Sequence, residues 1–183
     1  SALRLTFRDR LSLVDEDLVA FGWVLDFPMF EWNEDEERWD AAHHPFTMPR
    51  PNTYEEMMAD PTAVLSDAYD LVCNGYEVAS GSIRVHDPKL QADIFRVLGY
   101  DGAEAEARFG HLMKAFSYGA PPHGGIAPGI DRLVMILANA GSIREVIAFP
   151  KTTQATDLMA DSPSPVSDRQ LRDLHIQLLD EDD

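Results

Sequence analysis

A hairpin in the middle of the chain could place two carboxylates around one cation. Two β-forming runs flank Asn74-Gly75, the dipeptide that most readily adopts positive φ at both centres of a type I′ turn. That turn puts Asp70 and Glu77 on one face as diagonal neighbours, roughly 7–8 Å apart at the backbone. Oxygen ligands at this spacing suit Mg²⁺ that arrives on nucleotide phosphates. The plainer alternative is an exposed sheet face with two ordinary surface acids.

Arg84 lies further along the same strand and could meet an anionic group. Strict alternation would place Arg84 and Glu77 on opposite faces, because an odd number of positions separates them. A β-bulge at Ser80-Gly81 would reset the alternation, since glycine inside a strand is a typical bulge position. We therefore predict a bulged strand in which Arg84 joins Asp70 and Glu77 on one face.

The segment from Gly125 to Met135 predicts a helix start suited to a phosphate. A glycine-containing strand end leads into a helix, so free N–H groups and the positive end of the helix dipole point at any ligand there. Arg132 lies in the first turn, where its guanidinium can meet phosphate oxygens or stack on a base; the alternative is a surface arginine. An apolar stripe on the same helix is expected to pack in the core: Ile130, Leu133, Val134 and Leu137.

The elements that position these groups are hairpin strands with helices between them. We expect helices over 2–13, 88–98, 103–117 and from 130 onward, and strands over 19–25, 29–32, 69–73, 76–85, 146–149 and 174–178, with a short apolar strand before residue 130. The proline-rich loop 48–61 holds at most a short helix at 54–58. This order predicts one α+β domain with a single core and a mainly antiparallel sheet flanked by helices.

The composition argues against several classes of protein. The formal charge of -17 has the wrong sign for holding a phosphate backbone, so we expect weak or no binding of nucleic acid. The acidic runs 33–37 and 179–183 are interpreted as a solvated turn and an acidic tail. Cys73 is the single cysteine, which fits the reducing cytoplasm. No apolar run approaches a membrane span or a signal peptide, so we expect neither membrane insertion nor export.

Together these motifs resemble the class II aminoacyl-tRNA synthetases of the aspartate, asparagine and lysine subgroup. The run Gly-Ile-Asp-Arg-Leu-Val-Met at 129–135, followed by 143–151, resembles motif 3. Within the subgroup, His-His-Pro-Phe-Thr at 43–47 and the strand 75–86 are similar to the bacterial-type aspartyl enzymes, as are Asp26-Phe27-Pro28 and Glu31. The resemblance covers roughly residues 19–178.

The resemblance implies an ATP-dependent ligase that activates aspartate and transfers it to tRNA. Asp70 and Glu77 would hold Mg²⁺ carried on ATP, and His43 and Arg84 would bind aspartate. An isolated histidine pair is more often structural, so only the resemblance makes His43 a candidate for binding aspartate. Glu77 and Arg132 are the implied catalytic residues, and the implied ATP contacts are Glu77, Gly129, Ile130, Asp131 and Arg132. The parent enzyme would be a homodimer.

The chain also departs from the family pattern. We find no segment that resembles motif 1, motif 2 or the anticodon-binding barrel, and Ala79-Ser80 stands where the family tends to have glycines. We therefore expect residues 1–183 to be the C-terminal part of a synthetase catalytic domain, inactive alone, with residues 1–17 as the exit from an inserted domain. The alternatives are an asparagine ligase, a ligase that charges both tRNAs, or a non-catalytic nucleotide-binding module; Arg84 favours a carboxylate over an amide.

Overall fold

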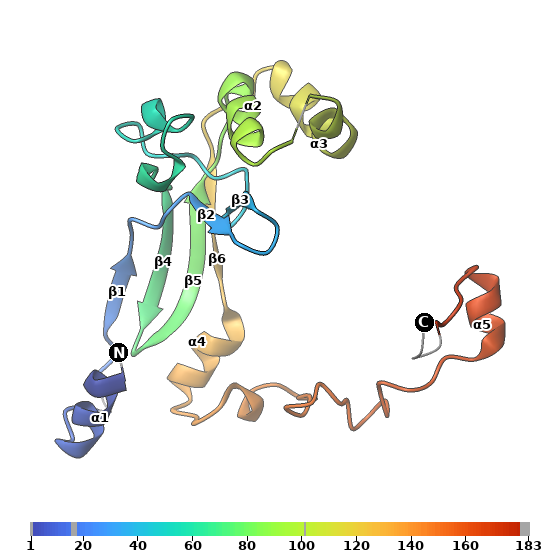
Figure 1. Cartoon of the computed structure of the whole chain (residues 1–183). Coiled ribbons are helices and arrows are strands. Elements are labelled where there is room, and N and C mark those ends of the chain that lie inside the picture. The colour runs from blue at the N-terminus through green and yellow to red at the C-terminus, as the bar shows by residue number, and fades with distance from the viewer. Residues whose placement is uncertain (1, 16–17, 101, 180–183) are drawn as a thin grey trace. The chain divides into compact units, whose positions relative to one another are not determined.

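Four antiparallel strands form the main sheet of the protein. The computed structural model describes residues 2–15, 18–100 and 102–179 and divides into two units, residues 1–132 and 133–183. In the first unit the strand order is β1 (Phe21–Val24), β4 (Ala68–Cys73), β5 (Tyr76–Ile83) and β6 (Gly124–Pro128), as Figure 1 shows. The expected α+β fold with an antiparallel sheet is confirmed.

The hairpin between β4 and β5 has the expected turn. Asn74 and Gly75 have φ values of 49° and 89°, so both central residues take the left-handed conformation that a type I′ turn requires. The Asn74 side chain also accepts a hydrogen bond from the Ala20 N–H (2.9 Å) and donates one to the Leu18 carbonyl (3.0 Å). The turn is therefore tied to the segment that leads into β1.

Strand β5 contains a β-bulge, but at Val78 and not at Ser80-Gly81 as the sequence suggested. Val72 pairs with Glu77 and Leu71 pairs with Ala79, so Val78 has no partner on β4, and pairing is regular from Ala79 onward. Val78 is 1% exposed, and its carbonyl accepts the Gly129 N–H at 2.8 Å. Burial and the contact with the segment after β6 hold the extra residue at this position.

Gly81 has a packing role in place of the expected bulge. A Cβ atom at Gly81 would lie 2.1 Å from the Gly125 carbonyl oxygen, 2.6 Å from Tyr69 Cε2 and 2.9 Å from the Ile126 Cα. Two of these neighbours are backbone atoms, so relief requires β5 and β6 to separate. Glycine is therefore needed where the two strands come close together.

Replacing Gly81 by alanine is expected to destabilise the fold by about 3 kcal/mol, because overpacking against backbone cannot be relieved by a rotamer change. Denaturant unfolding monitored by circular dichroism measures this loss. Gly125→Ala on the neighbouring strand is the matched control, since a Cβ there would meet nothing within 4 Å. Equal stability of the two variants would contradict the packing argument.

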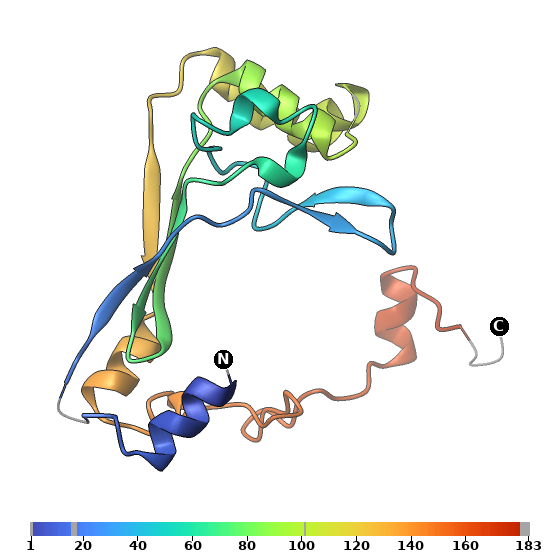
Figure 2. The same cartoon turned by 60° about the vertical axis from the view of Figure 1, so that its left-hand side comes forward.

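The hydrophobic core lies beyond one end of the main sheet. It forms between the two-stranded sheet of β2 (Phe30–Asn33) and β3 (Arg38–Ala41), the loop around residues 48–66, the end of β5 and helix α2 (Pro88–Val97). Figure 2 shows α2 and α3 (Gly102–Ser117) together at this end. The fully or nearly buried members are Met29, Phe30, Met57, Val64, Val85, Ile94 and Leu98.

The remaining elements of the first unit are short or exposed. Helix α1 (Ala2–Arg10) has no buried residue and ends before the expected position 13. The proline-rich loop contains two 3₁₀ turns, η1 (Tyr54–Glu56) where a short helix was expected and an additional η2 (Pro61–Ala63). Asp60 caps η2 by accepting the Thr62 N–H, which explains why this turn forms.

Two expected strands are wrong. Residues 146–149 follow the 3₁₀ turn η3 (Ile143–Glu145), and residues 174–178 follow helix α5 (Asp168–Asp173), which begins with a capping box between Ser167 and Gln170. Apolar runs become strands only when another strand offers its backbone, and none of the described residues pairs with these runs. The caps favour helical turns instead.

Helix α4 (Ile130–Leu137) begins in the first unit and ends in the second. The prediction that its apolar stripe packs in the core is wrong for three of the four members, since Ile130, Val134 and Leu137 are 65%, 42% and 79% exposed. Met135 is the buried residue of this helix. Within the described ranges no helix is long and apolar enough to cross a membrane. The predicted acidic tail lies, from residue 180 onward, outside the described residues.

Candidate active site

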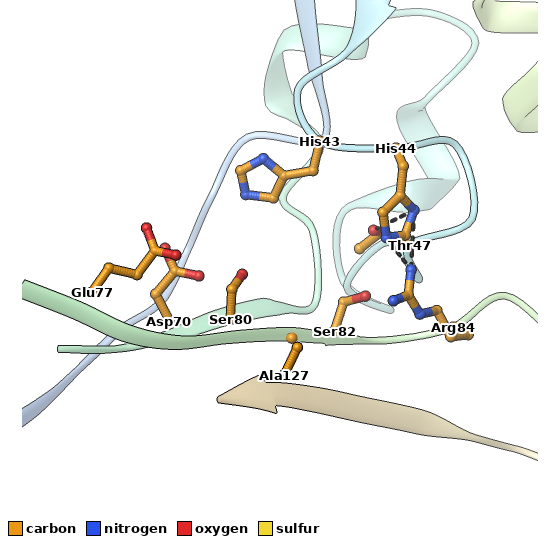
Figure 3. A pocket seen from close by; sticks show the side chains of 10 residues that line it. His43, His44, Thr47, Asp70, Glu77, Ser80, Ser82, Arg84 and Ala127 are labelled. Atoms are coloured by element: carbon orange, nitrogen blue, oxygen red, sulfur yellow. Dashed lines mark hydrogen bonds between the residues drawn. The ribbon is translucent and has the colours of Figure 1, made fainter. Parts of the chain in front are cut away.

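One face of the main sheet carries an open cavity of about 340 Å³. Figure 3 shows the side chains of β4 and β5 forming its floor, with two histidines from the loop after β3 facing them. The cavity brings together four residues that the sequence singled out, Asp70, Glu77, Arg84 and His43, with six others. Those six are His44, Thr47, Ser80, Gly81, Ser82 and Ala127.

The bulge at Val78 explains how both ends of β5 reach the same face. Asp70 pairs with Ser80, so the two point to one side, and Ser82 and Arg84 follow by alternation. Without the bulge, Ser80, Ser82 and Arg84 would point to the side opposite Asp70 and Glu77. Figure 3 shows all five side chains on the cavity side of the sheet, which confirms the predicted shared face.

Asp70 and Glu77 form the acidic end of the cavity. No hydrogen bond or ion pair joins the Asp70 carboxylate to another described residue, and the Glu77 carboxylate has only a 3.9 Å contact with Arg132. The described residues contain no group of three or more histidine, cysteine or acidic side chains that could hold a metal by themselves. Two carboxylates instead match a Mg²⁺ ion that keeps waters and shares phosphate ligands with a nucleotide.

Arg84 forms the basic end of the cavity and is half-buried. Its Nη1 lies 3.2 Å from His44 Nδ1 and also contacts Nε2 of that ring. No acidic side chain among the described residues pairs with it, and its Nε and Nη2 have no hydrogen-bond partner there. A half-buried guanidinium with one free edge has the geometry to bind a planar anion such as a carboxylate.

His44 is held in the neutral form beside this arginine. Burial, and after it the charge of Arg84, lowers the pKa of the His44 imidazole below its usual value. The Phe46 N–H points at Nδ1 at 3.2 Å, which assigns Nδ1 as a hydrogen-bond acceptor. The proton of the neutral ring is then on Nε2, so Nδ1 is the atom to which Arg84 Nη1 can also donate, at 3.2 Å, and the ring lies against the guanidinium without cancelling its charge.

Contacts with the core and with the end of β5 hold the loop that carries both histidines. Thr47 forms an antiparallel bridge with Arg84, and the buried Gln91 of α2 donates a hydrogen bond to the Pro45 carbonyl at 2.8 Å. Phe46 packs against Phe95 and Phe109, with ring centroids 6.2 and 5.7 Å away. The aromatic cluster thus determines where His44 meets the sheet.

His43 faces the floor of the cavity from the loop after β3. Its ring packs on Phe27, with 5.1 Å between centroids, and its Nδ1 lies 2.9 Å from the Ala42 carbonyl. In Figure 3 the ring lies above Ser80 and between the acidic pair and His44. The side chain is exposed and can reach a ligand lying on the sheet.

The segment 129–132 is joined to the bulge and does not line the cavity. Arg132 Nη1 donates to the Glu77 carbonyl at 2.6 Å, and the Gly129 N–H donates to the Val78 carbonyl. The Gly129 amide is therefore engaged by the sheet and is not one of the free N–H groups expected at this helix start. Ile130 and Asp131 are exposed, and Arg132, half-exposed, adjoins the acidic end of the site.

Sequence reasoning missed several lining residues, above all His44 and Ser82. The predicted face already implied Ser82, because it alternates with Arg84 along β5. His44 could not be separated from His43 by sequence, since which ring meets Arg84 depends on how the core holds the loop.

Residues 5–153 match the family described as tRNA synthetases class II (D, K and N). The chain belongs to this family of class II tRNA synthetases. It is 60% identical, over 96% of its length, to the aspartate–tRNA(Asp/Asn) ligase of Rubrobacter xylanophilus, and 52% identical over 96% to the aspartate–tRNA ligase of Macrococcus caseolyticus. It spans 29% and 30% of these relatives.

A solved structure of another class II synthetase shows the same fold. The putative aspartyl-tRNA synthetase of Leishmania major is 25% identical, with a TM-score of 0.54 over 85% of this chain and 25% of that one. The predicted resemblance to the aspartate, asparagine and lysine subgroup is therefore confirmed.

Proposed function

We propose that the chain is part of an aspartate–tRNA ligase, in which this cavity binds aspartate and the ATP with which it reacts. The observation that carries the proposal is the half-buried Arg84, which has no acidic partner among the described residues, at one end of a face whose other end holds Asp70 and Glu77. A positive end suits the side-chain carboxylate of aspartate, and an acidic end suits Mg²⁺ on a triphosphate.

The proposed first step needs positioning more than acid–base chemistry. The α-carboxylate of aspartate attacks the α-phosphate of ATP, which releases pyrophosphate and leaves aspartyl-adenylate. Arg84 would fix the amino acid by its side chain, with His43 closing over it, while Arg132 beside Glu77 would meet the nucleotide. Holding two reactants in line is worth several orders of magnitude in rate.

Asp70 and Glu77 would hold the Mg²⁺. Both offer oxygen ligands on one face, and neither carboxylate is engaged in a hydrogen bond with a described residue, so the donor set fits that ion. When bound, Mg²⁺ neutralises phosphate charge as it develops. We place Gly129, Ile130 and Asp131 along the path of the nucleotide, next to Arg132.

The experiment that tests this function is pyrophosphate exchange by the full-length protein that contains this chain. We expect exchange to depend on aspartate and to be at least about 100-fold slower with asparagine or lysine at equal concentration, because Arg84 offers only donors. Exchange that is independent of the amino acid, or none at all, would favour the non-catalytic nucleotide-binding module.

The second step would transfer the aspartyl group to tRNA. The relatives are named aspartate–tRNA(Asp/Asn) ligase or aspartate–tRNA ligase, and both names give aspartate as the amino acid. We propose the same amino acid here, in a cytoplasmic homodimer, with tRNA held mainly by parts outside this acidic chain. The isolated chain is proposed to be inactive, and aminoacylation assays of it beside the full-length protein test this.

A further inference from the structure

Ser82 lies on the floor of the cavity with a buried hydroxyl that no described residue satisfies. The residue is 3% exposed, and its Oγ is shielded from water without a hydrogen-bond partner among the described residues. A buried hydroxyl in this state has lost its water contacts and gained nothing in return. Such groups in native proteins call for an explanation.

The neighbours of Ser82 in the sheet leave its hydroxyl without a hydrogen-bond partner among the described residues. Its register partner on β4 is Ala68 and its partner on β6 is Gly125, so neither adjacent strand brings a polar side chain. On its own strand the same-face neighbours are Ser80 and Arg84, neither of which is hydrogen-bonded to Ser82 among the described residues, and Arg84 can donate but cannot accept the Ser82 proton. The remaining direction is the cavity that Ser82 lines (Figure 3).

We infer that Ser82 is a further substrate-binding residue, whose hydroxyl donates a hydrogen bond to the carboxylate that Arg84 binds. This inference rests on the proposed aspartate activation and names the group that shares the carboxylate with Arg84. Arg84 offers the edge formed by Nε and Nη2, and Ser82 adds a third, neutral donor two positions away on the same face. A carboxylate has enough lone pairs for all three.

The test measures pyrophosphate exchange by the full-length protein with Ser82→Ala. We expect the KM for aspartate to rise about tenfold, the usual loss for a hydrogen bond to a charged group, while the KM for ATP stays the same. The Tm of the unliganded variant should be unchanged or higher, because alanine removes a polar atom that had no partner.

Ser66→Ala is the matched control. Ser66 is 2% exposed, like Ser82, but its hydroxyl donates to the Phe27 carbonyl at 3.2 Å, so its loss should lower Tm and leave the KM for aspartate alone. An unchanged KM for aspartate in Ser82→Ala, or a fall in Tm with both KM values shifted, would overturn the role of Ser82. Absence of aspartate-dependent exchange in the unmodified protein would instead overturn the proposed function.

Discussion

Replacing Arg84 by lysine is expected to lower kcat/KM for aspartate by two to three orders of magnitude in pyrophosphate exchange. A lysine ammonium cannot present the two parallel N–H groups of the free guanidinium edge, so the desolvated carboxylate loses its bidentate partner. The loss should appear mainly in the KM for aspartate, because nothing in the geometry connects Arg84 to the acidic end of the cavity.

Arg108→Lys provides the control for this substitution. Arg108 lies on α3 and pairs with Glu104 at 2.9 Å on an exposed surface, where an ion pair contributes little to stability. Its exchange kinetics should match those of the unmodified protein. A loss of less than about fivefold in kcat/KM for aspartate in Arg84→Lys would show that Arg84 does not bind the aspartate side chain.

Replacing Glu77 by alanine is expected to slow aspartyl-adenylate formation by about three orders of magnitude at saturating ATP. The change removes one of the two carboxylates proposed to hold Mg²⁺, and charge neutralisation at phosphate is worth several kcal/mol. Arg132 should stay in place, because its 2.6 Å hydrogen bond goes to the Glu77 backbone and not to the side chain. Single-turnover measurement of pyrophosphate release would show the effect.

The companion variant is Glu55→Ala, in the exposed turn η1, which should leave the rate unchanged. If Glu77→Ala also retained most of the rate, the acidic pair would be two surface carboxylates. The family membership would stand, and the proposed metal site would not.

The hairpin and the shared face were predictable because they depend on local rules. Asn74-Gly75 sets its own turn, and a strand alternates whatever surrounds it. The position of the bulge was not predictable from Gly81, because glycine in a strand indicates either a bulge or a close approach of backbones. Only the proximity of β6, distant in sequence, shows that Gly81 serves the second purpose and that Val78 is the bulged residue.

The failures at residues 146–149 and 174–178 have a different cause. Both runs are apolar enough for a strand, but a strand needs a partner edge, and composition cannot show whether one is available. The failed prediction of a buried stripe on α4 has the same cause, because periodicity predicts which residues share a face but not what covers them.

The bulge at Val78 also restricts how this sequence can change in length. Glu77 and Arg84 face the same cavity only because one unpaired residue lies between them on β5. Deleting Val78 would keep the turn and the composition of the strand but invert every side chain beyond it, so that Ser80, Ser82 and Arg84 left the cavity together. Substitutions along β5 can therefore alter the site one residue at a time, whereas a single insertion or deletion removes half of it at once.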